Sequence, residues 1–197
     1  MFLHNQQHKA FMLTTMPKTP TPRTPTPKTP TASENPIIVV GLDPGLANLG
    51  LGAVREAGKD AVYLDSALIR TSSKQAQDER LEQLYHAVGN FLKLHQPHML
   101  AIEDQYFHQR GDIAFKVGQA FGVCLLAAKH HGVEVVSYGP MQVKQALVGS
   151  GKASKAQVAY MVRALLGLKK MPDSSHVADA LALALTHLSS RRIGALG

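Results

Sequence analysis

The chain has 197 residues, of which 45% are hydrophobic, and a formal net charge of +7 at pH 7. This length suits one domain with a tail, and the apolar content is enough for a real core. The basic balance favours an anionic partner. A single cysteine, Cys124, excludes a disulfide framework within the chain. No apolar stretch is long enough to cross a bilayer and the first residues lack a signal-peptide pattern, so we expect a cytoplasmic protein.

Residues 1–35 differ in composition from the rest of the chain. They contain the near-repeat T-P-T-P-R-T-P-T-P-K-T-P from Thr19 to Pro30. Proline at alternate positions removes backbone donors and favours polyproline II, so we expect a disordered, Thr/Pro-rich basic tail. Two other interpretations stay open. The segment is either a basic arm that touches nucleic-acid backbone, or the product of an upstream start codon with the true start at Met16 or later.

Hydrophobic periodicity predicts the elements of the remaining chain. In order, these are strands at Ile37–Asp43, Leu49–Arg55 and Ala61–Ile69, a helix at Glu79–His95, a strand at His98–Glu103, a helix at Ile113–His131 and a strand at Val133–Tyr138. Three more helices follow: one at Pro140–Val148, one that begins at a capping box formed by Ser154 and Gln157, and one at Ser175–Ser190. Three strands followed by alternating helices and strands predict an α/β domain over residues 36–190. We expect a five-stranded mixed sheet flanked by helices on both faces, followed by a short C-terminal tail, 191–197.

Four residues stand out as candidate metal ligands. Asp43 and Glu103 close two buried strands, and ligands bind at the carboxyl ends of strands in open α/β sheets. Asp179 lies in an apolar helix, three residues after His176, so these two side chains share a helix face. A set that is mostly carboxylate suits Mg²⁺ or Mn²⁺. Two such ions activate a water and stabilise the leaving oxygen in phosphodiester hydrolysis.

Each of these residues also has a purely structural interpretation. Asp43 precedes Pro-Gly and could simply cap a turn. His176 alone would more often be a core or cap histidine, but its spacing from Asp179 favours a ligand. Asp179 is surrounded by apolar residues, and buried acids are rarely left unpaired, which favours a functional role.

Five segments carry a resemblance to a known family. They are D-P-G-L-A-N-L-G at 43–50, A-I-E-D-Q-Y-F at 101–107, K-V-G-Q-A-F-G at 116–122, M-Q-V-K-Q-A-L-V-G at 141–149 and H-V-A-D-A-L-A-L-A-L-T-H at 176–187. Together they resemble RuvC, the bacterial Holliday-junction resolvases of ribonuclease H-like fold, over about residues 36–190. The resemblance implies that Asp43, Glu103, His176 and Asp179 are metal ligands. The family often has aspartate where His176 stands, so the metal preference of this chain is open.

Basic and aromatic residues indicate where DNA would bind. Lys144, Lys152 and Lys155 flank a glycine-rich loop, and such loops let the backbone approach phosphates. The resemblance carries Lys144 and Lys155 onto the family's DNA-contacting lysines. Tyr106 and Phe107 follow Glu103 in a polar linker, where an exposed aromatic ring can stack on a splayed base. The resemblance places Tyr106 at the base-stacking position.

The resemblance implies a homodimeric endonuclease that cuts four-way DNA junctions symmetrically in recombination and repair. It also implies work beside the RuvA/RuvB branch-migration proteins and dimer contacts around the helix at Ile113–His131. Two metal ions are expected in each site. Mn²⁺ is expected to work better than Mg²⁺, because the neutral imidazole of His176 replaces a carboxylate.

Two other function classes compete with this interpretation. One is an actin-like ATP-binding protein, because D-P-G-L-A-N-L-G could pass for a phosphate loop. That class needs two such domains, and this chain is long enough for one. The other is a junction-binding module without catalysis, which retention of all four ligand positions argues against.

Overall fold

The computed structural model describes residues 36–104 and 111–194. The predictions made for the tail at residues 1–35, and for Tyr106 and Phe107, lie outside these described residues.

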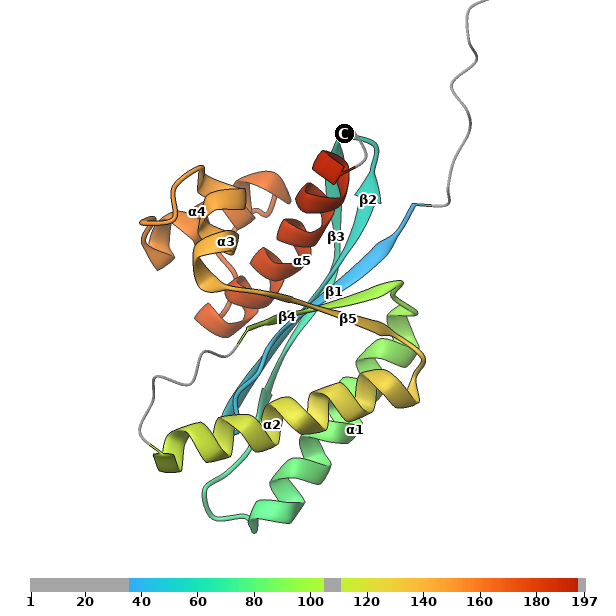
Figure 1. Cartoon of the computed structure of the whole chain (residues 1–197), viewed down its shortest axis with the longest axis vertical. Helices are drawn as coiled ribbons and strands as arrows, with labels where there is room; N and C mark the ends of the chain where they lie inside the picture. Colours follow the sequence, from blue (N-terminus) through green and yellow to red (C-terminus); the bar gives the residue numbers. More distant parts are fainter. Residues whose placement is uncertain (1–35, 105–110, 195–197) are drawn as a thin grey trace, which may run out of the picture. The chain divides into compact units, whose positions relative to one another are not determined.

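The described chain forms one mixed sheet with helices on both faces, as predicted (Figure 1). The strands are β1 (Ile38–Asp43), β2 (Asn48–Ala57), β3 (Asp60–Arg70), β4 (Met99–Glu103) and β5 (Glu134–Tyr138), and the helices are α1 (Gln77–His95), α2 (Gly111–His130), α3 (Pro140–Val148), α4 (Lys155–Leu165) and α5 (Ser175–Gly194). The strand order is β3-β2-β1-β4-β5. The first three strands pair antiparallel, whereas β4 pairs parallel with both β1 and β5.

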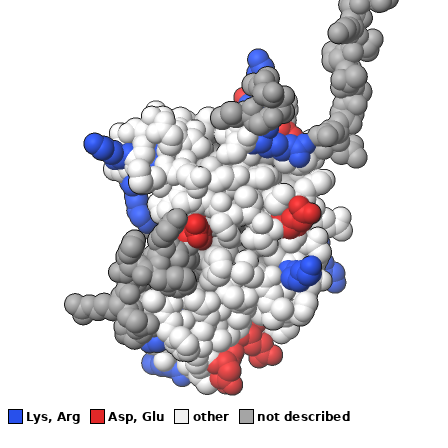
Figure 2. All heavy atoms as spheres, in the orientation of Figure 1, with Lys and Arg blue, Asp and Glu red and all other residues white. Residues whose placement is uncertain are grey.

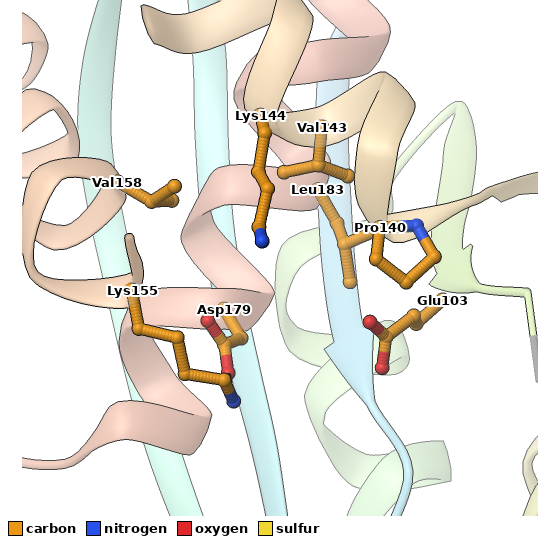
Figure 3. A pocket seen from close by; sticks show the side chains of 8 residues that line it. All are labelled: Glu103, Pro140, Val143, Lys144, Lys155, Val158, Asp179 and Leu183. Carbon is orange, nitrogen blue, oxygen red and sulfur yellow. Dashed lines mark hydrogen bonds and ion pairs between the residues drawn. The ribbon is translucent and has the colours of Figure 1, made fainter. Parts of the chain in front are cut away.

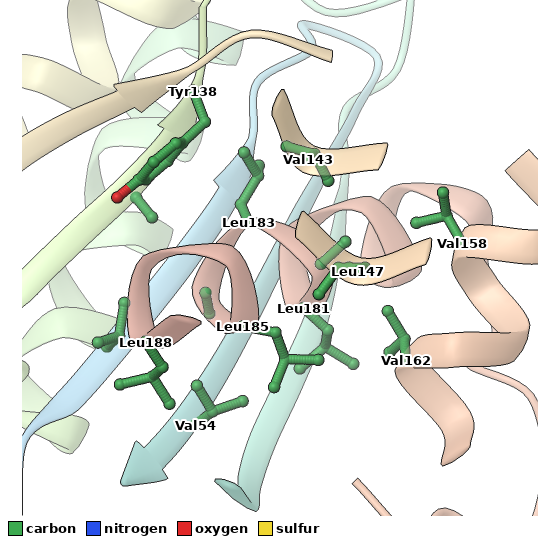
Figure 4. Close-up of a cluster of buried hydrophobic side chains, with 14 of the residues drawn as sticks. Val54, Tyr138, Val143, Leu147, Val158, Val162, Leu181, Leu183, Leu185 and Leu188 are labelled. Atoms are coloured by element: carbon green, nitrogen blue, oxygen red, sulfur yellow. The ribbon is translucent and has the colours of Figure 1, made fainter. Parts of the chain in front are cut away.

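Two apolar cores lie on opposite faces of the sheet. On one face, α1 and α2 cover residues such as Val40, Leu42 and Leu100. On the other face, the leucines of α5 pack between the sheet and the helices α3 and α4 (Figure 4). Residues 180–186 of α5 are all buried, as its nearly all-round apolar sequence predicts. None of the helices in the described part of the chain has the length and hydropathy that a membrane span needs.

The last helix continues past its predicted end at Ser190, to Gly194. Arg192 provides a physical reason, because its guanidinium donates hydrogen bonds to the carbonyl oxygens of Lys59, at 2.5 Å, and Asp60, at 2.7 Å. These contacts tie the final turn of α5 to the turn between β2 and β3.

Two glycines let α5 lie directly on the sheet. A Cβ atom added to Gly41 in β1 would lie 1.8 Å from the carbonyl oxygen of Ala180. One added to Gly50 in β2 would lie 2.1 Å from the carbonyl oxygen of His176. Both contacts are with helix backbone, which cannot rotate away as a side chain can. The backbone of α5 therefore rests on the strands without intervening side chains at these two points.

We predict that Gly41→Ala destabilises the protein strongly, by roughly 3 kcal/mol or more, because α5 must move off the sheet to make room for the methyl group. Chemical denaturation measures this free energy of unfolding. Gly151→Ala is the matched control, since the atoms nearest to its new Cβ would be those of Met141, at ordinary distances of 3.5 to 3.9 Å. Equal stability of the two variants would show that the close approach of α5 is not required.

Candidate active site

Two carboxylates emerge at the same edge of the sheet. Asp43 is the last residue of β1 and Glu103 is the last residue of β4. The two strands are parallel neighbours, with Leu42 opposite Ile102, so their carboxyl ends lie side by side. This arrangement agrees with the strand ends predicted from the sequence.

The start of α5 brings a third functional group to Asp43. Ser174 caps the helix, because its hydroxyl oxygen accepts a hydrogen bond from the backbone N–H of Val177 at 3.1 Å. His176, in the first turn, places Nδ1 2.6 Å from Oδ2 of Asp43. The imidazole N–H donates to the ionised carboxylate at this distance. The positive end of the α5 dipole adds to this stabilisation of negative charge.

Burial disfavours the charged form of Asp43. The residue is only 8% exposed. Burial raises the pKa of its carboxyl group, and the nearby charge of Asp179 raises it further. The hydrogen bond from His176 and the charge of Lys155 act in the opposite direction. An ionised Asp43 is therefore stabilised by any cation that comes close to it.

Asp179 is held by a lysine from a different helix. The ammonium Nζ of Lys155, the first residue of α4, lies 3.0 Å from Oδ2 of Asp179 (Figure 3). Hydrogen bonding and charge attraction to Asp179 raise the pKa of Lys155, and Asp43 and Glu103 contribute attraction from farther away. The lysine thus lies where the fields of all three carboxylates overlap.

Glu103, Asp179 and Lys155 share a small pocket at the edge of the sheet, whereas Asp43 and His176 are not part of its lining. It is lined by Glu103, Pro140, Val143, Lys144, Lys155, Val158, Asp179 and Leu183. Figure 3 shows the carboxyl groups of Glu103 and Asp179 on different sides of this pocket, with the Lys144 side chain reaching in from α3. The apolar members form a wall beside the carboxylates, while the Lys155 side chain stays 79% exposed to solvent.

The donor set suits a hard divalent cation, but it is not arranged as a ready cage. Among residues 36–104 and 111–194, no three carboxylate, histidine or cysteine side chains are grouped as ligands of one ion. Asp43 is engaged by His176, and Asp179 by Lys155. The Lys155 ammonium nevertheless shows that a cation is accommodated among these acids. The four-ligand set of Asp43, Glu103, His176 and Asp179 stays a prediction.

The predicted DNA-binding lysines fall into two groups. Lys144 and Lys155 line the pocket, whereas Lys152 is exposed on the loop between α3 and α4 and is not part of its lining. The sequence did not reveal the pairing of Lys155 with Asp179, or the apolar wall that includes Val143 and Val158. The capping box at Ser154, confirmed by its 3.2 Å bond from the Gln157 N–H, fixes where α4 begins but not what its first residue contacts.

Comparison with known proteins identifies the family. The protein-family model described as crossover junction endodeoxyribonuclease RuvC matches residues 39–187. The chain belongs to the RuvC family. A Thermus thermophilus RuvC is 46% identical over 161 residues, covering 80% of this chain and 97% of the relative. A Desulfitobacterium hafniense RuvC is 44% identical over 154 residues, covering 78% and 93%.

Solved RuvC structures share this architecture. The T. thermophilus RuvC structure matches with a TM-score of 0.75, covering 80% of this chain and 97% of that chain. The same protein in complex with a Holliday junction substrate matches with a TM-score of 0.77, covering 80% and 96%. Both are 46% identical to this chain. The ribonuclease H-like fold predicted from the sequence is therefore confirmed.

We predict that Asp43→Asn stabilises the metal-free protein at neutral pH. The folded state raises the pKa of Asp43, so ionising this group costs stability above that pKa, and the cost disappears below the pKa of the unfolded chain. The gain in Tm should therefore shrink as the pH is lowered, in thermal unfolding with EDTA present. Asp173→Asn is the control, because the Asp173 side chain is 79% exposed. A gain for Asp43→Asn that did not depend on pH would contradict this account.

Proposed function

We propose that this protein is a metal-dependent endonuclease that resolves four-way DNA junctions by paired, symmetric strand cleavage in recombination and repair. Membership of the RuvC family supports the reaction class. The observation that carries the proposal is the meeting of Asp43 and Glu103 at one sheet edge with His176 and Asp179 on the helix above it.

The chemistry follows from the charges at this edge. Asp43, Glu103, His176 and Asp179 would hold two divalent cations, Mg²⁺ or Mn²⁺. When bound, these ions supply an activated water and stabilise the departing oxygen. Hydrolysis adds the water oxygen to phosphorus and breaks the bond to the 3′ oxygen, which leaves a 5′-phosphate and a 3′-hydroxyl. His176 orients Asp43 through its hydrogen bond.

Basic side chains near the pocket would hold the DNA backbone. From Met141 onward the sequence has eight Lys or Arg residues and two acids, Asp173 and Asp179. Figure 2 shows basic side chains over α3 and α4, at the upper left of the face drawn. Lys144, Lys152 and Lys155 would contact phosphates, and Tyr106 or Phe107 would stack on an unpaired base. These roles, and work beside RuvA and RuvB, rest on family resemblance.

The catalytic unit would begin at residue 36 and include the whole of α5, to Gly194 rather than the predicted end at residue 190, with the tail at residues 1–35 dispensable for the chemistry. Pro36 precedes the buried Ile37 at the start of the sheet, so a chain that begins there keeps β1 whole. The tail would then contribute at most positive charge to DNA binding.

The decisive experiment separates cutting from binding. We expect Asp43→Asn, Glu103→Gln and Asp179→Asn each to lower the cleavage rate of a four-way junction by more than about 100-fold. Junction affinity without metal should hold or rise, because each change removes a charge that repels phosphate. Asp173→Asn, an exposed carboxylate outside the pocket, is the matched control and should cut normally.

Two outcomes would contradict this assignment. Near-normal cutting by any one of the three variants would remove that residue from the site. Junction binding by the native protein with no cutting in the presence of Mg²⁺ or Mn²⁺ would leave a binding module without catalysis.

The choice of metal should depend on His176. An imidazole suits Mn²⁺ better than Mg²⁺, which prefers oxygen and gives up water reluctantly. We therefore expect Mn²⁺ to support faster cutting than Mg²⁺ at equal, sub-saturating concentration. His176→Asp should narrow this difference where the shorter carboxylate reaches the ion. The measurement is the cleavage rate against metal concentration for both proteins. Full activity of His176→Ala with both ions would show that His176 is not a ligand.

Paired cutting needs two active sites, and α2 offers a face for a second copy. Phe115 is 68% exposed and Leu126 is 49% exposed. Gly122 lies between them with no atom within 4 Å of its Cβ position. These three positions, spaced by seven and four residues, fall on one side of the helix. We propose that this face pairs with its copy in a homodimer.

We predict that Leu126→Glu converts the dimer to a monomer in sedimentation at micromolar concentration, because it brings like charges together across the two-fold axis. The dissociation constant should rise at least about thirtyfold, the effect of losing a hot-spot contact. Leu94→Glu, at a 71% exposed position in the last turn of α1, is the control and should remain dimeric. A native protein that is monomeric at this concentration would contradict the proposal.

A further inference from the structure

The ion pair between Lys155 and Asp179 joins two side chains with different proposed functions. Asp179 is a proposed metal ligand and Lys155 is a proposed phosphate contact. In the structure the two are engaged with each other, with 3.0 Å between Nζ and Oδ2. Neither group can perform its task at full strength while this pair is intact. A cation at Asp179 must compete with the ammonium, and a phosphate at Lys155 must compete with the carboxylate.

The ion pair between Lys155 and Asp179 is weak enough to be displaced by a competing ion. The Lys155 side chain is 79% exposed, and ion pairs of this kind change an equilibrium constant by a factor of about five or less. The base of the side chain is nevertheless fixed, because Ser154 and Gln157 cap the start of α4 reciprocally. Lysine has a flexible stem, so the ammonium can swing while its Cα stays in place.

After its release from Asp179, the Lys155 ammonium could contact a phosphate bound in the same pocket. Lys144, from α3, lines the same pocket as Lys155 (Figure 3). No hydrogen bond or ion pair joins Lys144 to another residue in the described part of the chain. A phosphate drawn to the pocket by Lys144 would meet a second ammonium only once Lys155 has left Asp179.

We propose that Lys155 couples metal binding to DNA binding, by occupying Asp179 in the metal-free protein and contacting a substrate phosphate once a divalent cation has displaced it. This inference rests on the proposed metal site. Coupling of this kind is reciprocal, so DNA must raise metal affinity by the same factor by which metal raises DNA affinity. The metal-free protein is thereby kept from presenting its full positive charge to DNA that it cannot cut.

The first test measures metal affinity without DNA. Mn²⁺ binding, followed by electron paramagnetic resonance or calorimetry, should be about three- to fivefold tighter in Lys155→Met than in the native protein, because the competitor is gone. Lys144→Met is the matched control. It removes one positive charge from the same pocket without breaking an ion pair, and should change Mn²⁺ affinity by at most about twofold. Lys155→Arg keeps the charge and should stay close to native.

The second test measures the coupling itself. Junction affinity is compared with and without saturating Ca²⁺, after Ca²⁺ has been checked for lack of cutting. The native protein should gain affinity when Ca²⁺ binds, and Lys155→Met should gain at least about threefold less. Lys144→Met should bind more weakly overall but keep the native gain.

The outcomes separate this inference from the proposed function. Suppose that the native protein binds Mn²⁺ and cuts junctions, but that Lys155→Met and Lys144→Met bind Mn²⁺ with equal affinity. This result overturns the coupling role of Lys155 and leaves the proposed function intact. A native protein that neither binds Mn²⁺ nor cuts overturns the proposed function with it. Tighter Mn²⁺ binding together with a reduced gain on Ca²⁺ addition supports the proposal.

Discussion

The contact between the α5 backbone and the glycines of β1 and β2 determines where the candidate functional groups of α5 lie relative to those of the strands. Gly41 meets Ala180 and Gly50 meets the carbonyl of His176, with no side chain between strand and helix. This fixes the height of α5 above the sheet and the position of its first turn. As a result His176 reaches Asp43, and Asp179 faces the same edge. Larger residues at these positions would lift the helix and separate its ligands from those of the strands.

Electrostatics explains why acids and bases are interleaved at this edge. Asp43 is buried at the end of a strand, where an unpaired charge is costly. In the structure the Asp43 carboxylate is met by the imidazole of His176, and the Asp179 carboxylate is met by the ammonium of Lys155. Both partners come from helices on one face of the sheet, α5 for His176 and α4 for Lys155.

The pocket and the proposed dimer face lie on opposite faces of the sheet. Helices α3, α4 and α5 pack on one face and carry the pocket. Helices α1 and α2 pack on the other face, and α2 keeps exposed apolar residues on its outer side. This separation would let the proposed dimer form through α2 while the pocket stays open to DNA. The sheet between the two layers would hold the paired sites at a constant separation.

The sequence by itself determined the elements and the ends of the strands. Runs of apolar residues specified β1 and β4, and the acids that close them, Asp43 and Glu103, stood out because each interrupts such a run. The bounds of α3 agreed with prediction because Pro140 opens the helix and Gly149, with φ +78°, closes it. Only the tertiary structure decided the pairings. His176 and Asp43 are 133 residues apart, and Lys155 and Asp179 are 24 apart on different helices. No local pattern encodes such contacts, because they depend on how closely α5 approaches the sheet and how α4 packs beside it.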